Sequence, residues 1–200
     1  MKLGHLQYKV EDLHRGVEQF RDLGFTVEYG SGEDKSFNAI IWFEDGPFLE
    51  LFSDDYLKSF KMKLMMRLAG MIGRKGLVER FKYYQTLPLG FCDLCLESKE
   101  DNLDKENEII RDYFDFDKLK GRRKTASGDK LKWDLSIPRD IKFPFLMSAY
   151  NIPQKPNKIN HSNGAKGFTK VRVKSRPEFF KLLNILVDDD ILTIDEDLNT

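Results

Sequence analysis

The sequence predicts an α+β fold built from two copies of a strand–helix–strand–strand–strand unit, written βαβββ. Residues 4–10 alternate between polar and apolar side chains, and an amphipathic helix and three more strand-like stretches follow before residue 53. The same order of elements recurs from residue 90. The 200 residues, 40% of them hydrophobic, can form such a pair but not two large independent domains.

The first unit is assigned to residues 1–53. Alternation over its first strand places His5, Gln7 and Lys9 on one face. Asp12 has a side chain suited to a helix N-cap, and Gly24, which has no side chain, is suited to the stop after the last turn, so a helix is expected at 12–23. Polar turns rich in glycine then separate three strands, expected at 25–29, 36–43 and 47–52.

The second unit is assigned to residues 87–150. Trp133 and its apolar neighbours alternate with polar residues, which is typical of a half-buried strand. The expected elements are a strand at 90–97, a helix at 102–114, a strand or loop at 121–127, and strands at 130–137 and 143–150.

A helical insertion is expected at 54–86, between the two units. Its apolar residues have helical spacing, and the glycines from Gly70 to Gly76 predict two helices joined by a flexible corner. This basic, Met-rich segment fits a lid, a dimer contact, a membrane-surface element or ordinary packing over the sheet. Residues 151–200 are expected to form a loop and a partial third unit, with a strand at 167–173, a helix at 177–187 and a short strand at 191–194.

Charge and composition exclude several classes of protein. The 33 basic residues equal the 33 acidic ones, so no global field attracts nucleic acid. The chain begins without the apolar region of a secretory signal and has no apolar run of membrane-spanning length, which predicts a cytoplasmic protein without a membrane partner. Cys92 and Cys95 lie three apart in an expected strand and therefore on opposite faces, so we expect neither a disulfide nor a zinc pair.

Several motifs together resemble the glyoxalase-like proteins of the vicinal oxygen chelate superfamily, over about 4–53 and 87–175. They are Gly4 to Leu13, Leu23 to Phe25, Phe37 to Phe43, Phe48 to Leu51, Leu131 to Pro138, Pro144 to Leu146 and His161 to Ala165. The resemblance implies that the two units pack so that their curled, mixed sheet forms a cup with a divalent metal at its floor. The superfamily contains isomerases, dioxygenases and drug-sequestering proteins, so the fold leaves the reaction open.

The resemblance also implies which residues would hold the metal. In metal-bearing members the ligands come from the first and fourth strands of each unit, where this sequence has His5 and Glu50 in the first unit. Aligning the second unit on the first places Phe91 and Met147 at the other two positions, so the ligand set is incomplete. Either no metal binds tightly, or Mn, Fe, Ni, Mg or Zn binds with a third ligand, taken from Cys92, Asp93 or His161.

Aromatic residues near these positions predict a pocket for an organic ligand. Phe48 and Phe52 share the face of Glu50, and together with Phe91 and Met147 they would convert a metal floor into an apolar pocket. His161 precedes the Asn163-Gly164 turn and is a candidate catalytic acid or base, or else a polar turn residue. We expect His14 to face solvent.

These observations predict a glyoxalase-like protein that holds a small oxygen-bearing organic molecule in the cup. The alternative is a metal-dependent lyase, isomerase or dioxygenase that polarises vicinal oxygens. A third hypothesis, an interaction protein that uses its basic helix, rests only on charge segregation. A homodimer is compatible with all three.

Overall fold

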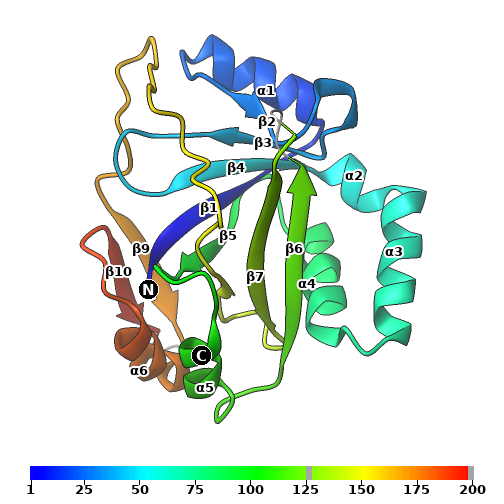
Figure 1. Ribbon diagram of the computed structural model, residues 1–200, viewed down its shortest axis with the longest axis vertical. Helices are drawn as coiled ribbons and strands as arrows, with labels where there is room; N and C mark the ends of the chain where they lie inside the picture. Colours follow the sequence, from blue (N-terminus) through cyan, green and yellow to red (C-terminus); the bar gives the residue numbers. More distant parts are fainter. Residues whose placement is uncertain (125–127, 198–200) are drawn as a thin grey trace.

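The computed structural model describes residues 1–124 and 128–197 and contains one curled, eight-stranded mixed sheet (Figure 1). The strand order is β2-β3-β4-β1-β5-β8-β7-β6. The first unit consists of β1 (Lys2–Val10), α1 (Leu13–Asp22), β2 (Glu28–Tyr29), a 3₁₀ turn (Glu33–Lys35), β3 (Asn38–Ile41) and β4 (Phe48–Ser53). The second consists of β5 (Gly90–Glu97), α5 (Asp104–Ile110), β6 (Phe116–Lys124), β7 (Lys130–Pro138) and β8 (Phe145–Met147).

The two halves of the sheet repeat each other. In each unit the first strand pairs in parallel with the fourth, β1 with β4 and β5 with β8, and the remaining pairs are antiparallel. The halves join through the antiparallel pair of β1 and β5. This topology confirms the predicted α+β fold of paired βαβββ units.

The main core lies between the sheet and the helices α1, α5 and α6 (Pro177–Leu186). Leu6 and Val10, on the apolar face of β1, are buried there, as are Val17 of α1 and Ile110 of α5. Because strand residues alternate between faces, His5, Gln7 and Lys9 are directed to the other, concave face of the sheet.

The predicted N-cap of α1 is present, since the Asp12 side chain accepts a hydrogen bond from the Arg15 backbone N–H at 2.8 Å. We expect Asp12→Ala to lower the free energy of unfolding by about 1 kcal/mol, because one N–H of the first turn loses its partner. Urea denaturation measures the change. Asp22→Ala, at the exposed end of the same helix, is the matched control, and an equal loss in both variants would refute a capping effect.

The insertion forms three helices, α2 (Asp54–Lys58), α3 (Phe60–Met71) and α4 (Lys75–Thr86), where two were expected. The break comes at Ser59, whose backbone is extended and whose hydroxyl accepts the N–H of Met62 at 3.2 Å. The buried Lys9 ammonium of β1 donates to the carbonyls of Tyr84 and Leu87, both at 2.8 Å, and so ties the end of α4 to the sheet. The mobility of the corner between α3 and α4 stays a prediction.

The C-terminal strands do not extend the main sheet. β9 (Val171–Ser175) and β10 (Leu192–Glu196) form a separate parallel pair connected through α6. The expected strand at 121–127 begins earlier, at Phe116, and its residues 125–127 lie outside the described part of the chain. Within the described ranges, no helix is long and apolar enough to cross a membrane.

Candidate functional site

A cavity of about 500 Å³ lies in the concave face of the sheet, within the size range of small-molecule sites. Strands of both units line it, and α3 and α4 of the insertion contribute further residues. Its apolar lining includes Phe48, Leu135, Ile137, Phe145, Met147, Met65 and Met66. Its polar lining includes His5, Gln7, Asn38, Glu50 and Arg80. The sequence predicted four of these residues as site residues, namely His5, Phe48, Glu50 and Met147.

His5 is held between two aromatic rings at the floor of this cavity. Its side chain is almost wholly buried, stacked on Phe48 at 4.6 Å between ring centroids and edge-on to Phe145 at 5.5 Å. Burial lowers the pKa of His5, opposed by the smaller effects of Glu50 and Asp93, so the imidazole is neutral near pH 7. Its Nδ1 atom is buried and makes no hydrogen bond to the residues described.

Glu50 lies beside His5, with Oε2 at 3.4 Å from the imidazole Nε2. The Asn38 side-chain amide donates to Oε1 of Glu50, and the Gln7 amide donates to Oε2 at 3.2 Å. Three neighbouring strands, β1, β3 and β4, therefore fix the position of the carboxylate. The arrangement presents an anion and a neutral imidazole together inside a mainly apolar cavity.

A second charged cluster, which sequence reasoning missed, lies deeper in the wall. Arg80 of α4 is 3% exposed, forms an ion pair with Asp93 of β5 and donates to the Phe143 carbonyl. Tyr84, one turn further along α4, donates its hydroxyl proton to the same carboxylate. In the sequence, Arg80 is one of several basic residues of the insertion. Nothing in the local sequence distinguishes it from the basic residues that face solvent.

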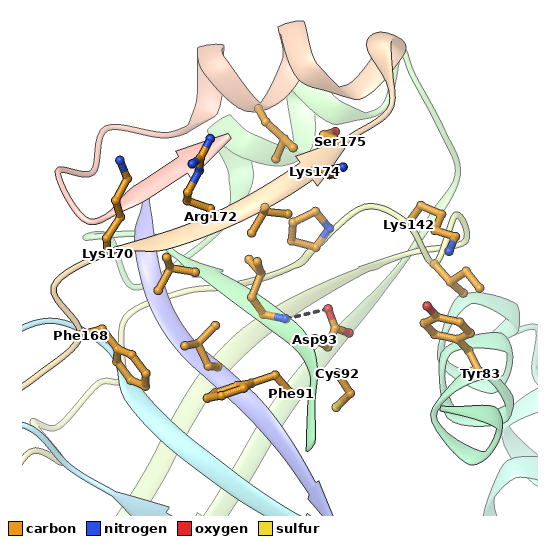
Figure 2. Close-up of a pocket in the computed structure, with 17 residues that line it drawn as sticks. Tyr83, Phe91, Cys92, Asp93, Lys142, Phe168, Lys170, Arg172, Lys174 and Ser175 are labelled. Atoms are coloured by element: carbon orange, nitrogen blue, oxygen red, sulfur yellow. Dashed lines mark hydrogen bonds between the residues drawn. The ribbon is translucent and has the colours of Figure 1, made fainter. Parts of the chain in front are cut away.

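The expected place of Phe91 in the cup is wrong. Gln7 is opposite Asp93 and Tyr8 is opposite Phe91, so β5 has a bulge at Cys92 that moves Phe91 to the other face. Phe91 is 62% exposed and packs edge-on to Tyr8. It lines a separate cavity of about 550 Å³, where Figure 2 shows it near Phe168 and below the basic strand β9.

The register of the parallel strand pairs makes Cys95, not Phe91, the second-unit counterpart of His5. His5 pairs with Phe48 in the first unit, Cys95 pairs with Phe145 in the second, and His5 and Cys95 are opposite each other where the units join. The register also makes Met147 the counterpart of Glu50, because they follow the two phenylalanines at equal spacing. The four floor positions are therefore held by His5, Glu50, Cys95 and Met147.

This donor set does not fit a hard divalent ion. Burial raises the pKa of the Cys95 thiol well above its usual value, so it stays protonated, and Met147 offers only a thioether. Glu50 already accepts two amide hydrogen bonds. Among the described residues, no group of three or more His, Cys, Asp or Glu side chains is arranged to hold a metal ion.

Phe52 and His161, two other predicted site residues, are not among the residues that line the cup. Phe52 packs against Tyr84 and Leu57 in a separate buried cluster. His161 accepts the Thr26 backbone N–H at Nδ1, at 2.9 Å, so its Nε2 carries the proton and donates to the Trp42 carbonyl, also at 2.9 Å. Its imidazole therefore links the C-terminal loop to the first unit, as the turn-residue alternative suggests.

The two cysteines and His14 make contacts that stabilise the fold. Cys92 and Cys95 are both free thiols. Cys92 lies at the β5 bulge beside Phe52, and Cys95 packs against Phe145. His14 is exposed and forms a hydrogen bond with the Tyr29 hydroxyl at 2.9 Å.

Comparison with known proteins gives both a family and a fold. The model of the family described as "Glyoxalase-like domain" matches residues 3–182. A hypothetical protein from Staphylococcus aureus has a similar structure, with a TM-score of 0.59 and 16% identity over 98% of this chain and 86% of that one. Methylmalonyl-CoA epimerase from Streptomyces coelicolor, in complex with 2-nitronate-propionyl-CoA, gives a TM-score of 0.45 and 15% identity over 74% and 95%. Among curated proteins, none matches the sequence.

Proposed function

Because the chain belongs to the glyoxalase-like domain family of the vicinal oxygen chelate superfamily, we propose that it binds a small organic molecule in the cup through His5 and Glu50. The observation that carries the proposal is the pair formed by His5 and Glu50, which both line the cavity with Nε2 and Oε2 3.4 Å apart, while Nδ1 of His5 has no hydrogen-bond partner among the described residues. An unsatisfied buried polar atom costs about 1–3 kcal/mol, and a bound ligand would remove that cost.

The chemistry of the floor indicates the kind of ligand. When neutral His5 carries its proton on Nε2, toward Glu50, its Nδ1 is a hydrogen-bond acceptor. Glu50 is also an acceptor, so both groups favour a ligand that donates from a hydroxyl, enol or amide group. The aromatic and Met residues of the wall favour an apolar body for the rest of that molecule.

Catalysis is the second candidate, favoured by the neutral imidazole next to a fixed carboxylate. His5 could accept a proton from a bound ligand, with Glu50 stabilising the imidazolium that forms. The metal-dependent form of this candidate, a lyase, isomerase or dioxygenase, needs a third ligand that Cys95 and Met147 supply poorly. Metal analysis of protein purified without chelator tests it: stoichiometric metal, lost in both His5→Ala and Glu50→Ala, would favour the metal enzyme.

Ligand binding is tested with a library of small hydroxylated aromatic compounds and protein labelled at its methionine methyl groups. We expect compounds that shift the NMR signal of Met147 to bind at least tenfold more weakly to His5→Phe and to Glu50→Gln. His5→Phe removes a floor acceptor at nearly constant shape, and Glu50→Gln removes the negative charge and replaces one acceptor oxygen with a donor. His14→Phe is the matched control, since it removes an exposed imidazole outside the cup. Full affinity in both floor variants would refute the site.

A further inference from the structure

The helix α3 exposes an apolar stripe along its outer side. Phe60, Leu64, Leu68 and Met71 lie on one face of the helix, and Ile72 follows at its end. Phe60, Met71 and Ile72 are each at least 74% exposed, and Leu64 and Leu68 about half. Met62 and Ala69, on the opposite face, are buried against the protein. Contiguous exposed apolar surface of this kind marks an interaction site in soluble proteins.

The charged residues in and around α3 are all basic. Residues 59–75 contain five basic residues and no acidic one. By helical geometry Lys63 and Arg67 follow one edge of the stripe, and Lys61, which is also exposed, lies toward its other edge. An apolar face bordered by Lys and Arg is the pattern of helices that lie in the interface of an anionic membrane.

This charge distribution argues against a second copy of the chain as the occupant. In a two-fold symmetric dimer, the same patch of each subunit meets itself, so the basic residues of both copies would be brought together. Asp54, one of the few acids of the insertion, already pairs with Lys9 and Lys58. We propose that α3 docks this protein on an anionic lipid surface, with the apolar stripe inserted between the headgroups.

Docking through α3 would also bring the cup close to the lipid. Met65 and Met66 of the same helix line the cavity, so one side of α3 faces the cup and the other carries the exposed stripe. Figure 1 shows α3 at the periphery of the molecule, outside α4. An apolar ligand could then pass between lipid and cup beside this helix. Docking itself needs no cup ligand, so its test is independent of the proposed function.

The test is cosedimentation of the full chain with vesicles, either of phosphatidylcholine alone or of equal parts phosphatidylcholine and phosphatidylglycerol. We expect binding to the anionic vesicles only, weakened at least tenfold between 50 and 500 mM NaCl. Phe60→Ser/Leu68→Ser and Lys63→Glu/Arg67→Glu should each weaken binding at least tenfold. Circular dichroism should show both variants folded, because all four side chains are exposed.

Matched controls remove the same chemistry elsewhere on the surface. Leu23→Ser/Ile185→Ser replaces two exposed apolar residues, and Lys105→Glu/Lys181→Glu replaces two exposed cations. Both controls should bind as the native chain does. Three results would overturn the proposal: no binding to anionic vesicles at 50 mM NaCl, equal losses in controls and stripe variants, or a native dimer in light scattering that Phe60→Ser/Leu68→Ser converts to monomer.

Discussion

Replacing Arg80 with leucine is expected to lower the free energy of unfolding by about 3 to 5 kcal/mol, the usual effect of removing one partner of a buried ion pair. The variant leaves the carboxylate of Asp93, whose side chain is only 10% exposed, without its cation. It also removes the donor to the Phe143 carbonyl. The Tyr84 hydroxyl would remain as a donor to Asp93, but a neutral hydrogen bond does not replace a guanidinium. Urea denaturation at pH 7 measures the loss.

Two further variants make this result specific to the buried pair. Lys82→Leu removes an exposed cation from the same helix and should change stability by less than about 0.5 kcal/mol. The double variant Arg80→Leu/Asp93→Leu should recover a large part of the loss, because it leaves no buried charge unpaired. If the two single losses simply add in the double variant, the pair is not coupled and our account of the cluster fails.

The parts of the site that could be predicted from sequence are those set by strand alternation. Alternation places His5 and Glu50 on the polar faces of their own strands, and the pairing of β1 with β4 brings these faces together. Alternation is a property of the local backbone, so a short stretch of sequence is enough to assign a face. The order of elements was predictable for the same reason, since each helix and strand has its own periodicity.

The parts that could not be predicted depend on a bulge or on tertiary contacts. One extra residue at Cys92 shifts the alternation of β5 and turns Phe91 away from the cup. The pairing of β5 with β8 separately places Cys95, four residues further along, at the position equivalent to His5. A bulge has no reliable signal in a single sequence, because the side chains on both sides remain compatible with a strand. The role of Arg80 depends on the packing of α4 against β5, and that of His161 on two distant carbonyl and amide groups.

Glu97→Gln is expected to stabilise the protein by about 2 to 3 kcal/mol at pH 8 and to have little effect at pH 4.5. Burial at the end of β5 raises the pKa of Glu97 from 4.5 to about 7, so the folded state favours the protonated carboxyl. That stabilisation is fully present below pH 4.5 and is lost as the pH rises toward 7, because the unfolded chain then releases its proton while the folded chain keeps it. Glutamine resembles the protonated form at every pH.

Comparison of the native chain with Glu97→Gln across pH separates the effect of Glu97 from that of His5, whose contribution to stability changes with pH in the opposite direction. Burial lowers the pKa of His5 below 6.5, so its contribution is present above pH 6.5 and is lost as the pH falls. Both chains contain His5, so the difference between their free energies of unfolding, measured in urea at pH 4.5, 6, 7 and 8, reports Glu97 alone. That difference should grow up to about pH 7 and then level off. Glu100→Gln, at an exposed position, is the control, and its free energy of unfolding should differ from that of the native chain by the same amount at every pH. If the difference for Glu97→Gln were also constant, Glu97 would ionise as readily in the folded protein as in the unfolded chain, and the prediction would be wrong.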